Sequence, residues 1–186
     1  MDGKTILKKE LLKGEEILWQ GQPETKAIFS SGDILLIPFS VLWSWLVFQW
    51  EFDLVMASSP FALLGVPIVF MALYALFGRF IYKNSDKKRT LYVVTNQRLI
   101  QIRLSNLLYR DLKVKLISQI PNIQKKIRSG GIGTLLFDRP TLDSTVFGNS
   151  GMPLIHGRHN EKHNVFAFYD IPNAEVVYKI VSDLKS

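Results

Sequence analysis

Two uncharged stretches decide the fold of this chain: Ile34-Leu-Leu-Ile-Pro-Phe-Ser-Val-Leu-Trp-Ser-Trp-Leu-Val-Phe-Gln-Trp50 and Pro60-Phe-Ala-Leu-Leu-Gly-Val-Pro-Ile-Val-Phe-Met-Ala-Leu-Tyr-Ala-Leu-Phe-Gly78. An α-helix rises about 1.5 Å per residue, so about 17–20 apolar residues cross a hydrocarbon layer of about 30 Å. The stretches therefore predict membrane-spanning helices at about 34–50 and 60–80, within a hairpin over 33–82. The alternative is a pair of core helices in a soluble protein, but such helices usually carry a polar face, which neither stretch has.

Charged residues flank both stretches. A carboxylate at mid-membrane costs about 2.5–3.5 kcal/mol, which places Asp33, Glu51, Asp53 and Arg79 at or beyond the membrane edges. The linker 51–59 carries acidic residues and no basic ones. Basic residues gather before the first helix and after the second: Lys4, Lys8, Lys9, Lys13, Lys26, Arg79, Lys83, Lys87, Lys88 and Arg89. The positive-inside rule then predicts a multi-pass plasma-membrane protein with both termini in the cytoplasm.

After Tyr82 the sequence changes to short β-branched and aromatic segments separated by turn residues. This pattern is typical of antiparallel strands, expected at 91–95, 98–103, 109–116, 120–128, 133–137 and 164–168, with a weak strand near 145–147. A further short strand is expected at 15–21. Pro172 and Asn173 precede a helix with one apolar face, made of Ala174, Val177, Tyr178, Val181 and Leu184.

The expected fold class is an α+β membrane protein: a two-helix transmembrane hairpin plus an antiparallel β-barrel or sandwich closed by a C-terminal helix. Three parts follow along the chain. Residues 1–30 form a cytoplasmic N-terminal arm whose short strand joins the folded domain. Residues 33–82 form the hairpin, and residues 90–186 form the cytoplasmic domain.

The composition limits the chemistry. The chain has 186 residues, a formal net charge of +7 and no cysteine, which excludes disulfides, zinc–thiolate sites and thiol nucleophiles. Basic residues dominate from position 79 to position 128, and beside a membrane they attract anionic lipid headgroups. Nucleic acid is the rival partner for a basic patch, and the hairpin argues against it. The candidate headgroup contacts are Lys113, Lys115, Lys125, Lys126 and Arg128, with ordinary surface lysines as the alternative.

Two further motifs have a chemical interpretation and a structural one. The glycine-rich segment 129–133 lacks the Gly-Lys-Ser/Thr ending of a phosphate loop and predicts a hairpin turn. The histidines at 156, 159 and 163 are metal-ligating residue types, to which Asp138, Asp143 or Asp170 would add a carboxylate. Their spacing fits no helical zinc motif, so a solvated loop is expected. We predict no catalytic residue, no metal and no cofactor.

One family combines these features. The segments that carry the resemblance are Gly14-Glu-Glu-Ile-Leu-Trp-Gln-Gly21, Leu91-Tyr-Val-Val-Thr-Asn-Gln-Arg-Leu-Ile100, Gly131-Ile-Gly-Thr-Leu135 and Phe168-Tyr-Asp-Ile-Pro-Asn-Ala-Glu175. The chain resembles bacterial membrane proteins with a pleckstrin-homology-like (PH-like) domain over nearly its whole length. The resemblance implies a partly open barrel of about seven strands, closed by the C-terminal helix, and a non-enzymatic role at the cytoplasmic membrane surface.

The expected function is therefore a membrane-anchored binding or scaffold module. Its expected partners are the lipid bilayer and either a protein partner or a second copy, with no nucleic acid. Phosphoinositide binding is not expected, because residues 19–23 lack the basic pattern of eukaryotic PH domains. Two alternatives stay open: a small metal-dependent membrane hydrolase using the histidine loop, and an accessory subunit of a membrane transporter.

Overall fold

The computed structural model describes residues 7, 10–104, 110–128, 130–152 and 165–185. The chain divides into two compact units. The hairpin unit consists of Ile28–Lys83 and Leu142–His163, and the head consists of Met1–Ala27, Asn84–Thr141 and Asn164–Ser186. The fold is α+β, with two long apolar helices in the hairpin unit and two antiparallel sheets in the head.

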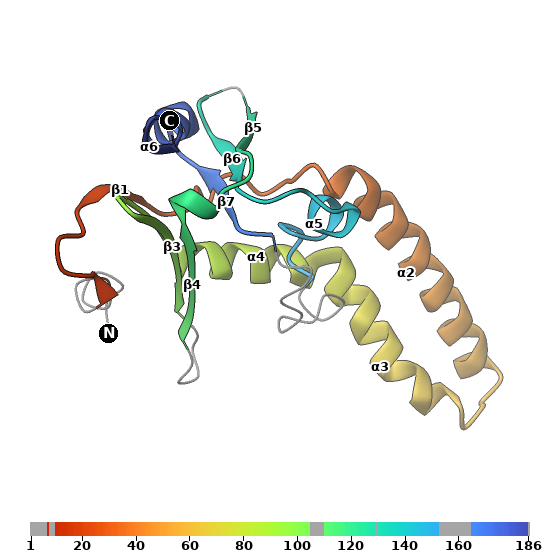
Figure 1. Ribbon diagram of the computed structural model, residues 1–186. Coiled ribbons are helices and arrows are strands. Elements are labelled where there is room, and N and C mark those ends of the chain that lie inside the picture. Colours follow the sequence, from red (N-terminus) through yellow and green to blue (C-terminus); the bar gives the residue numbers. More distant parts are fainter. Residues whose placement is uncertain (1–6, 8–9, 105–109, 129, 153–164, 186) are drawn as a thin grey trace. The chain divides into compact units, whose positions relative to one another are not determined.

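The hairpin unit is built on two helical rods that lie side by side (Figure 1). The first is α2 (Asp33–Met56). The second runs through α3 (Ala62–Leu73), the π-helical turn η1 (Tyr74–Gly78) and α4 (Arg79–Lys88), of which residues 84–88 belong to the head. The Ser44 hydroxyl donates a hydrogen bond to the Ala72 carbonyl across the pair, at 3.3 Å. Outside this contact the helices expose large apolar side chains, among them Ile34, Leu63 and Ile81.

The helices are longer than the sequence predicts. α2 continues to Met56, so Glu51 lies inside a helix rather than in a linker. Its carboxylate rests on α3 at Gly65, where the Cβ of any other residue would stand 1.6 Å from Glu51 Oε2. The difference has a physical reason, because charge limits how deep a residue sits in a membrane but does not stop a helix.

A short helix replaces the weak strand predicted near 145–147. Helix α5 (Leu142–Val146) packs against the start of α2, where a Cβ on Gly32 would stand 2.1 Å from the Val146 carbonyl oxygen. Farther along the same segment, the Tyr74 hydroxyl donates to the Gly151 carbonyl at 2.8 Å. The strand prediction is therefore wrong, because the segment packs against α2 as a short helix.

The described residues of the head form seven strands in two sheets. The first sheet, sheet A, has the order β1 (Ile17–Gly21), β2 (Thr90–Thr95), β3 (Arg98–Leu104) and β4 (Arg110–Leu116). The second sheet, sheet B, has the order β5 (Gln124–Ile127), β6 (Gly133–Leu136) and β7 (Ala167–Ile171). All neighbouring strands run antiparallel. The glycine-rich segment joins β5 to β6, which confirms the predicted hairpin turn.

Most predicted strands agree with the structure to within about two residues at each end, and two differ by more. The strand predicted at 120–128 shortens to β5, preceded by the 3₁₀ turn η2 (Ile117–Gln119). The strand predicted at 164–168 lies later in the chain, at β7. Pairing with β6 determines this register, and a single-strand pattern does not contain that information.

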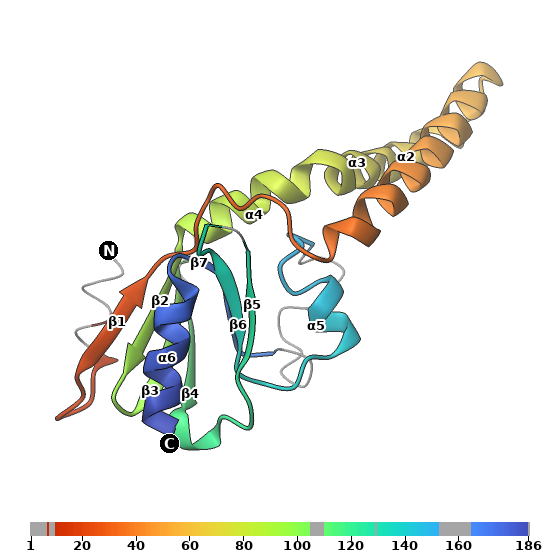
Figure 2. The same cartoon turned by 90° about the horizontal axis from the view of Figure 1, so that it is seen from above.

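A single core joins the two sheets. Tyr92, Leu99, Leu135, Phe137 and Phe168 come together from both sheets, and Tyr92 stacks on Phe168 with ring centroids 4.5 Å apart. The C-terminal helix α6 (Ala174–Lys185) closes this core with its predicted apolar face (Figure 2). Within the described residues the ladders do not join β4 to β5 or β7 to β1, so the head is not a closed barrel.

Candidate functional site

Three of the five predicted headgroup contacts lie on or just after β5. Lys125 donates to Glu175 Oε1 at 2.7 Å and stands 4.4 Å from the centroid of the Tyr178 ring. Lys126 is exposed and, as the next residue in a strand, points to the opposite face. Arg128 is also exposed, and its Nη1 lies 3.9 Å from Asp170 Oδ1. Lys126 and Arg128 are therefore the more available cations of this group, which we call the β5 basic group.

The other two predicted contacts lie on β4, in the other sheet. Lys115 forms an ion pair with Asp138. Lys113 is half-buried, and this burial lowers the pKa of its ammonium group. The structure thus separates the five predicted residues into two groups on strands that do not pair. Their contact with lipid headgroups stays a prediction.

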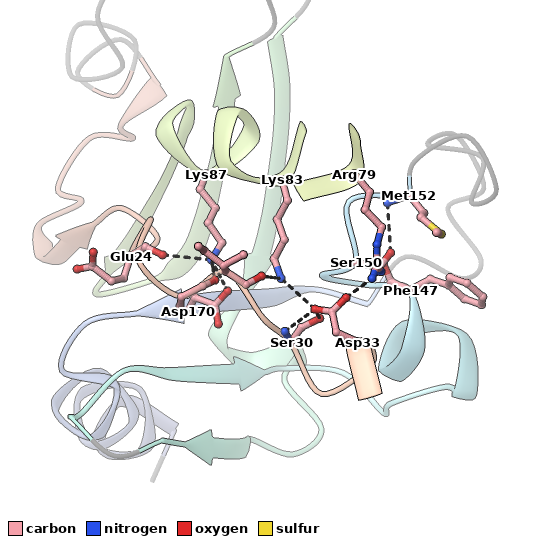
Figure 3. Close-up of polar contacts among 12 residues, drawn as sticks. Glu24, Ser30, Asp33, Arg79, Lys83, Lys87, Phe147, Ser150, Met152 and Asp170 are labelled. Carbon is pink, nitrogen blue, oxygen red and sulfur yellow. Dashed lines mark hydrogen bonds and ion pairs between the residues drawn. The ribbon is translucent and has the colours of Figure 1, made fainter. Parts of the chain in front are cut away.

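A row of buried basic side chains is a feature that sequence reasoning missed. Arg79, Lys83 and Lys87 follow one another at four-residue spacing and leave the same side of α4 (Figure 3). In the sequence they belong to the basic excess that predicts the membrane orientation. All three are almost wholly buried. The four-residue spacing was visible in the sequence, but nothing there named the acidic partners.

Within the hairpin unit, Asp33 neutralises the first two members of the row. Arg79 Nη1 lies 2.8 Å from Asp33 Oδ1, and Lys83 Nζ lies 3.6 Å from Asp33 Oδ2. Ser30 donates its backbone N–H and its hydroxyl to the same Asp33 oxygen, at 2.6 and 2.7 Å. Lys83 also donates to the Ile28 carbonyl at 2.7 Å. Because Asp33 begins α2, its charge additionally faces the positive end of the helix dipole.

Within the head, Lys87 has an equivalent set of partners. Its Nζ lies 2.6 Å from Asp170 Oδ2 and donates to the carbonyls of Glu24 and Ala27. Asp170 holds a left-handed backbone conformation, with φ +50°, and its carbonyl accepts a hydrogen bond from the Glu24 N–H at 2.7 Å. Lys87 thus ties the segment that follows β1 to the end of β7.

The outer face of sheet A, on the side away from the main core, is apolar. Leu91, Val93, Ile100 and Ile102 are buried there under Leu7. An ion pair fixes this N-terminal segment: Arg98 Nε and Nη2 donate to the two carboxylate oxygens of Glu15 at 2.8 and 2.9 Å. Burial opposes the charge on Glu15, but hydrogen bonds from Arg98, Leu12 and Thr95 outweigh it and lower its pKa.

This apolar face continues onto β4, where it is exposed. Leu112 and Val114 pair with Ile102 and Ile100 of β3, so they lie on the same face as those buried residues. Leu116 completes the row. The three side chains are 38%, 41% and 43% exposed. We call Leu112, Val114 and Leu116 the β4 apolar row.

The histidine loop, with the side chain of Asp143, lies outside the described residues. Among the residues that the structure does describe, no group of three or more acidic or histidine side chains could hold a metal ion. No family model, curated protein or solved structure matches the chain. The interpretation of the surfaces therefore depends on their own geometry.

Proposed function

We propose that this protein is a membrane-anchored binding or scaffold module whose hairpin spans the plasma membrane. The apolar exposure of the hairpin helices carries this proposal. At about 1.5 Å per residue, α2 is about 36 Å long, enough for a hydrocarbon layer of about 30 Å. A core helix of a soluble protein would be mostly buried. In the two rods, only 28% and 17% of the most apolar 18-residue stretch is buried. Such exposed apolar side chains are more stable in the hydrocarbon of a membrane than in water.

The orientation with both termini in the cytoplasm rests on the flanking charges. The turn between the rods is preceded by Glu51 and Asp53 and contains no basic residue. The opposite ends carry the basic residues, including the exposed Lys88 and the buried row of α4. This asymmetry supports a head at the anionic cytoplasmic leaflet.

The head suits binding rather than catalysis. The seven strands of its described residues, in sheets of four and three with α6 against their common core, support a PH-like domain. The head offers two exposed features to partners: the β5 basic group, for an anionic membrane surface, and the β4 apolar row, for a protein. A tether at the membrane raises the effective concentration of either partner, so weak contacts suffice.

Alkaline extraction of native membranes tests the anchor. The full chain should stay in the membrane pellet, and its release into the supernatant would contradict the proposal.

A second measurement tests the lipid contact, with the full chain in nanodiscs of anionic or purely zwitterionic lipid. Hydrogen exchange over 124–128 should slow in the anionic nanodiscs, and Lys126→Glu with Arg128→Glu should abolish the difference. The matched control is Lys179→Glu, at an exposed position on α6, which should preserve the difference.

A further inference from the structure

We propose that a second copy of this chain pairs with β4, so that sheet A continues from one head into the other through two antiparallel β4 strands. The inference deepens the proposed function, because it names the protein partner and relies on the membrane tether. It rests on the backbone of β4, on the β4 apolar row and on the charge pattern of the strand.

The backbone shows which groups of β4 are available. Ile117 donates its N–H to the Gln97 carbonyl of the preceding turn, in register with the β3–β4 ladder. Because hydrogen-bonded positions alternate along an antiparallel strand, residues 111, 113 and 115 direct their backbone groups toward β3. Leu112 and Val114 therefore direct theirs away from β3. In the described part of the chain, β4 is hydrogen-bonded in a sheet to β3 alone.

The side chains select one register. In a pairing centred on Lys113, Leu112 lies opposite Val114 of the other copy, and Asp111 lies opposite Lys115. The first pair adds apolar contact and the second adds opposite charges, both of which stabilise cross-strand neighbours. The outward backbone groups of Leu112 and Val114 then form the hydrogen bonds between the two strands.

A neighbouring register fits less well. Centring the pair on Val114 would place Lys113 opposite Lys115, and like charges directly opposite each other are destabilising. The register centred on Lys113 does bring the two Lys113 residues together at the axis. Each is diagonal to Asp111 of the other copy, and burial already lowers the pKa of its ammonium group. Each Lys113 is also diagonal to Lys115 of the other copy, so Asp111 offsets only part of the positive charge at the axis.

The absence of cysteine makes this geometry directly testable. A single cysteine at position 113 would face the cysteine of the second copy, across a non-hydrogen-bonded pair with Cα atoms about 4.5 Å apart. Disulfides form at Cα separations of about 4.4–6.8 Å. In the same register two copies of residue 112 are about 8–9 Å apart, beyond that range. Lys113→Cys should therefore cross-link, whereas Leu112→Cys should not.

The experiment uses the full chain in native membranes, oxidised with copper phenanthroline and followed as a dimer band. Ser118→Cys is the matched control for random collision, because Ser118 is exposed and lies just beyond β4. We expect at least a tenfold higher dimer yield from Lys113→Cys than from either control. Equal yields from the three variants would overturn the proposal.

A second substitution separates strand pairing from mere proximity. Val114→Pro removes an N–H that β3 does not use, so an edge strand tolerates it, but the N–H is needed by the second copy. Val114→Pro added to Lys113→Cys should abolish the cross-link while the head stays resistant to protease. Leu112→Glu, which leaves the backbone intact, should also abolish the cross-link. Undiminished cross-linking in both would contradict pairing through β4.

The same membranes distinguish the two proposals. If the anchor fails, the chain leaves the membrane at alkaline pH whatever its cross-linking. If the chain stays in the membrane but Lys113→Cys yields only monomer, the pairing is wrong and the anchor stands.

Discussion

The buried row of α4 and the β5 basic group contain the same residue types in opposite surroundings. The Lys87–Asp170 pair has side chains 6% and 2% exposed, whereas those of the Lys125–Glu175 pair are 40% and 46% exposed. Both pairs have short contacts between nitrogen and oxygen, at 2.6 and 2.7 Å. Distance therefore does not distinguish them, and burial does.

Burial changes what an ion pair does. In water an exposed pair contributes about 0.2–1 kcal/mol, because solvent and salt screen it. Removing one partner of a buried pair leaves an uncompensated charge and costs about 3–5 kcal/mol. Breaking an ion pair of the α4 row therefore costs more stability than breaking the exposed Lys125–Glu175 pair. Arg98 and Glu15, at 14% and 0% exposed, fall between the two cases.

The largest expected effect follows from Lys87→Met. It removes the buried ammonium from Asp170, where the more distant Arg128 stays at 3.9 Å, and removes two hydrogen bonds to backbone carbonyls. The head should lose about 3–5 kcal/mol of unfolding free energy. Pulse proteolysis of the head across a urea series, with the protein in detergent, measures this loss.

Lys88→Met is the matched control, because Lys88 is the next residue of the same helix and is exposed. It should change the unfolding free energy by less than about 0.5 kcal/mol. Similar losses from the two substitutions would remove the distinction between buried and exposed basic residues.

Glu15→Gln should have an intermediate effect. It keeps the shape of the side chain but removes the charge that accepts both Arg98 hydrogen bonds. Hydrogen bonds to charged groups contribute about 1.5–3 kcal/mol, so we expect a loss in that range near neutral pH. Faster proteolysis of the segment before β1 should accompany it, since this ion pair fixes that segment. Unchanged proteolysis would show that the apolar contact of Leu7 is sufficient.

The same pair predicts a pH dependence. The pKa of Glu15 lies below its ordinary value of 4.5 in the folded head, so the folded state favours the charged carboxylate. Its contribution is fully present above that ordinary value and is lost as the pH falls through the folded-state pKa. The stability difference between the wild type and Glu15→Gln should therefore shrink in acid. Urea midpoints measured from pH 7 to pH 3 test this, and a constant difference would contradict it.

The smallest expected effect belongs to Lys125→Gln. Its ion pair with Glu175 is exposed and screened, and the cation–π contact with Tyr178, which the substitution also removes, contributes little at an exposed site. The unfolding free energy should fall by less than about 1 kcal/mol. A loss as large as that from Lys87→Met would place Lys125 among the structural cations and remove it from the headgroup contacts.

The sequence predicts elements best where a pattern is local. The two apolar helices, the strands β2 and β3 and the apolar face of α6 are each recognisable from a few neighbouring residues. The glycines before β6 likewise indicate their turn, because Gly130 and Gly131 adopt positive φ. These features depend on periodicity or on the conformational freedom of a single residue type.

Features that depend on distant partners could not be predicted in this way. From the sequence alone, the basic residues of the α4 row indicate only the membrane orientation. Their acidic partners, Asp33 and Asp170, are distant in the sequence, so the ion pairs could not be predicted. The helix α5 depends on packing against α2, across more than a hundred residues of chain. The β4 apolar row looks like a core face in the sequence, and only the sheet order shows that β4 lies at an edge.

Labelling of single cysteines in intact cells tests the membrane hairpin most directly. Ser58 lies in the turn between the rods and Ser118 lies in the head, and the chain has no cysteine of its own. A membrane-impermeant maleimide should label Ser58→Cys from outside, and Ser118→Cys only after the membrane is permeabilised. Labelling of Ser118→Cys in intact cells, or protection of Ser58→Cys, would contradict a hairpin that holds the head in the cytoplasm.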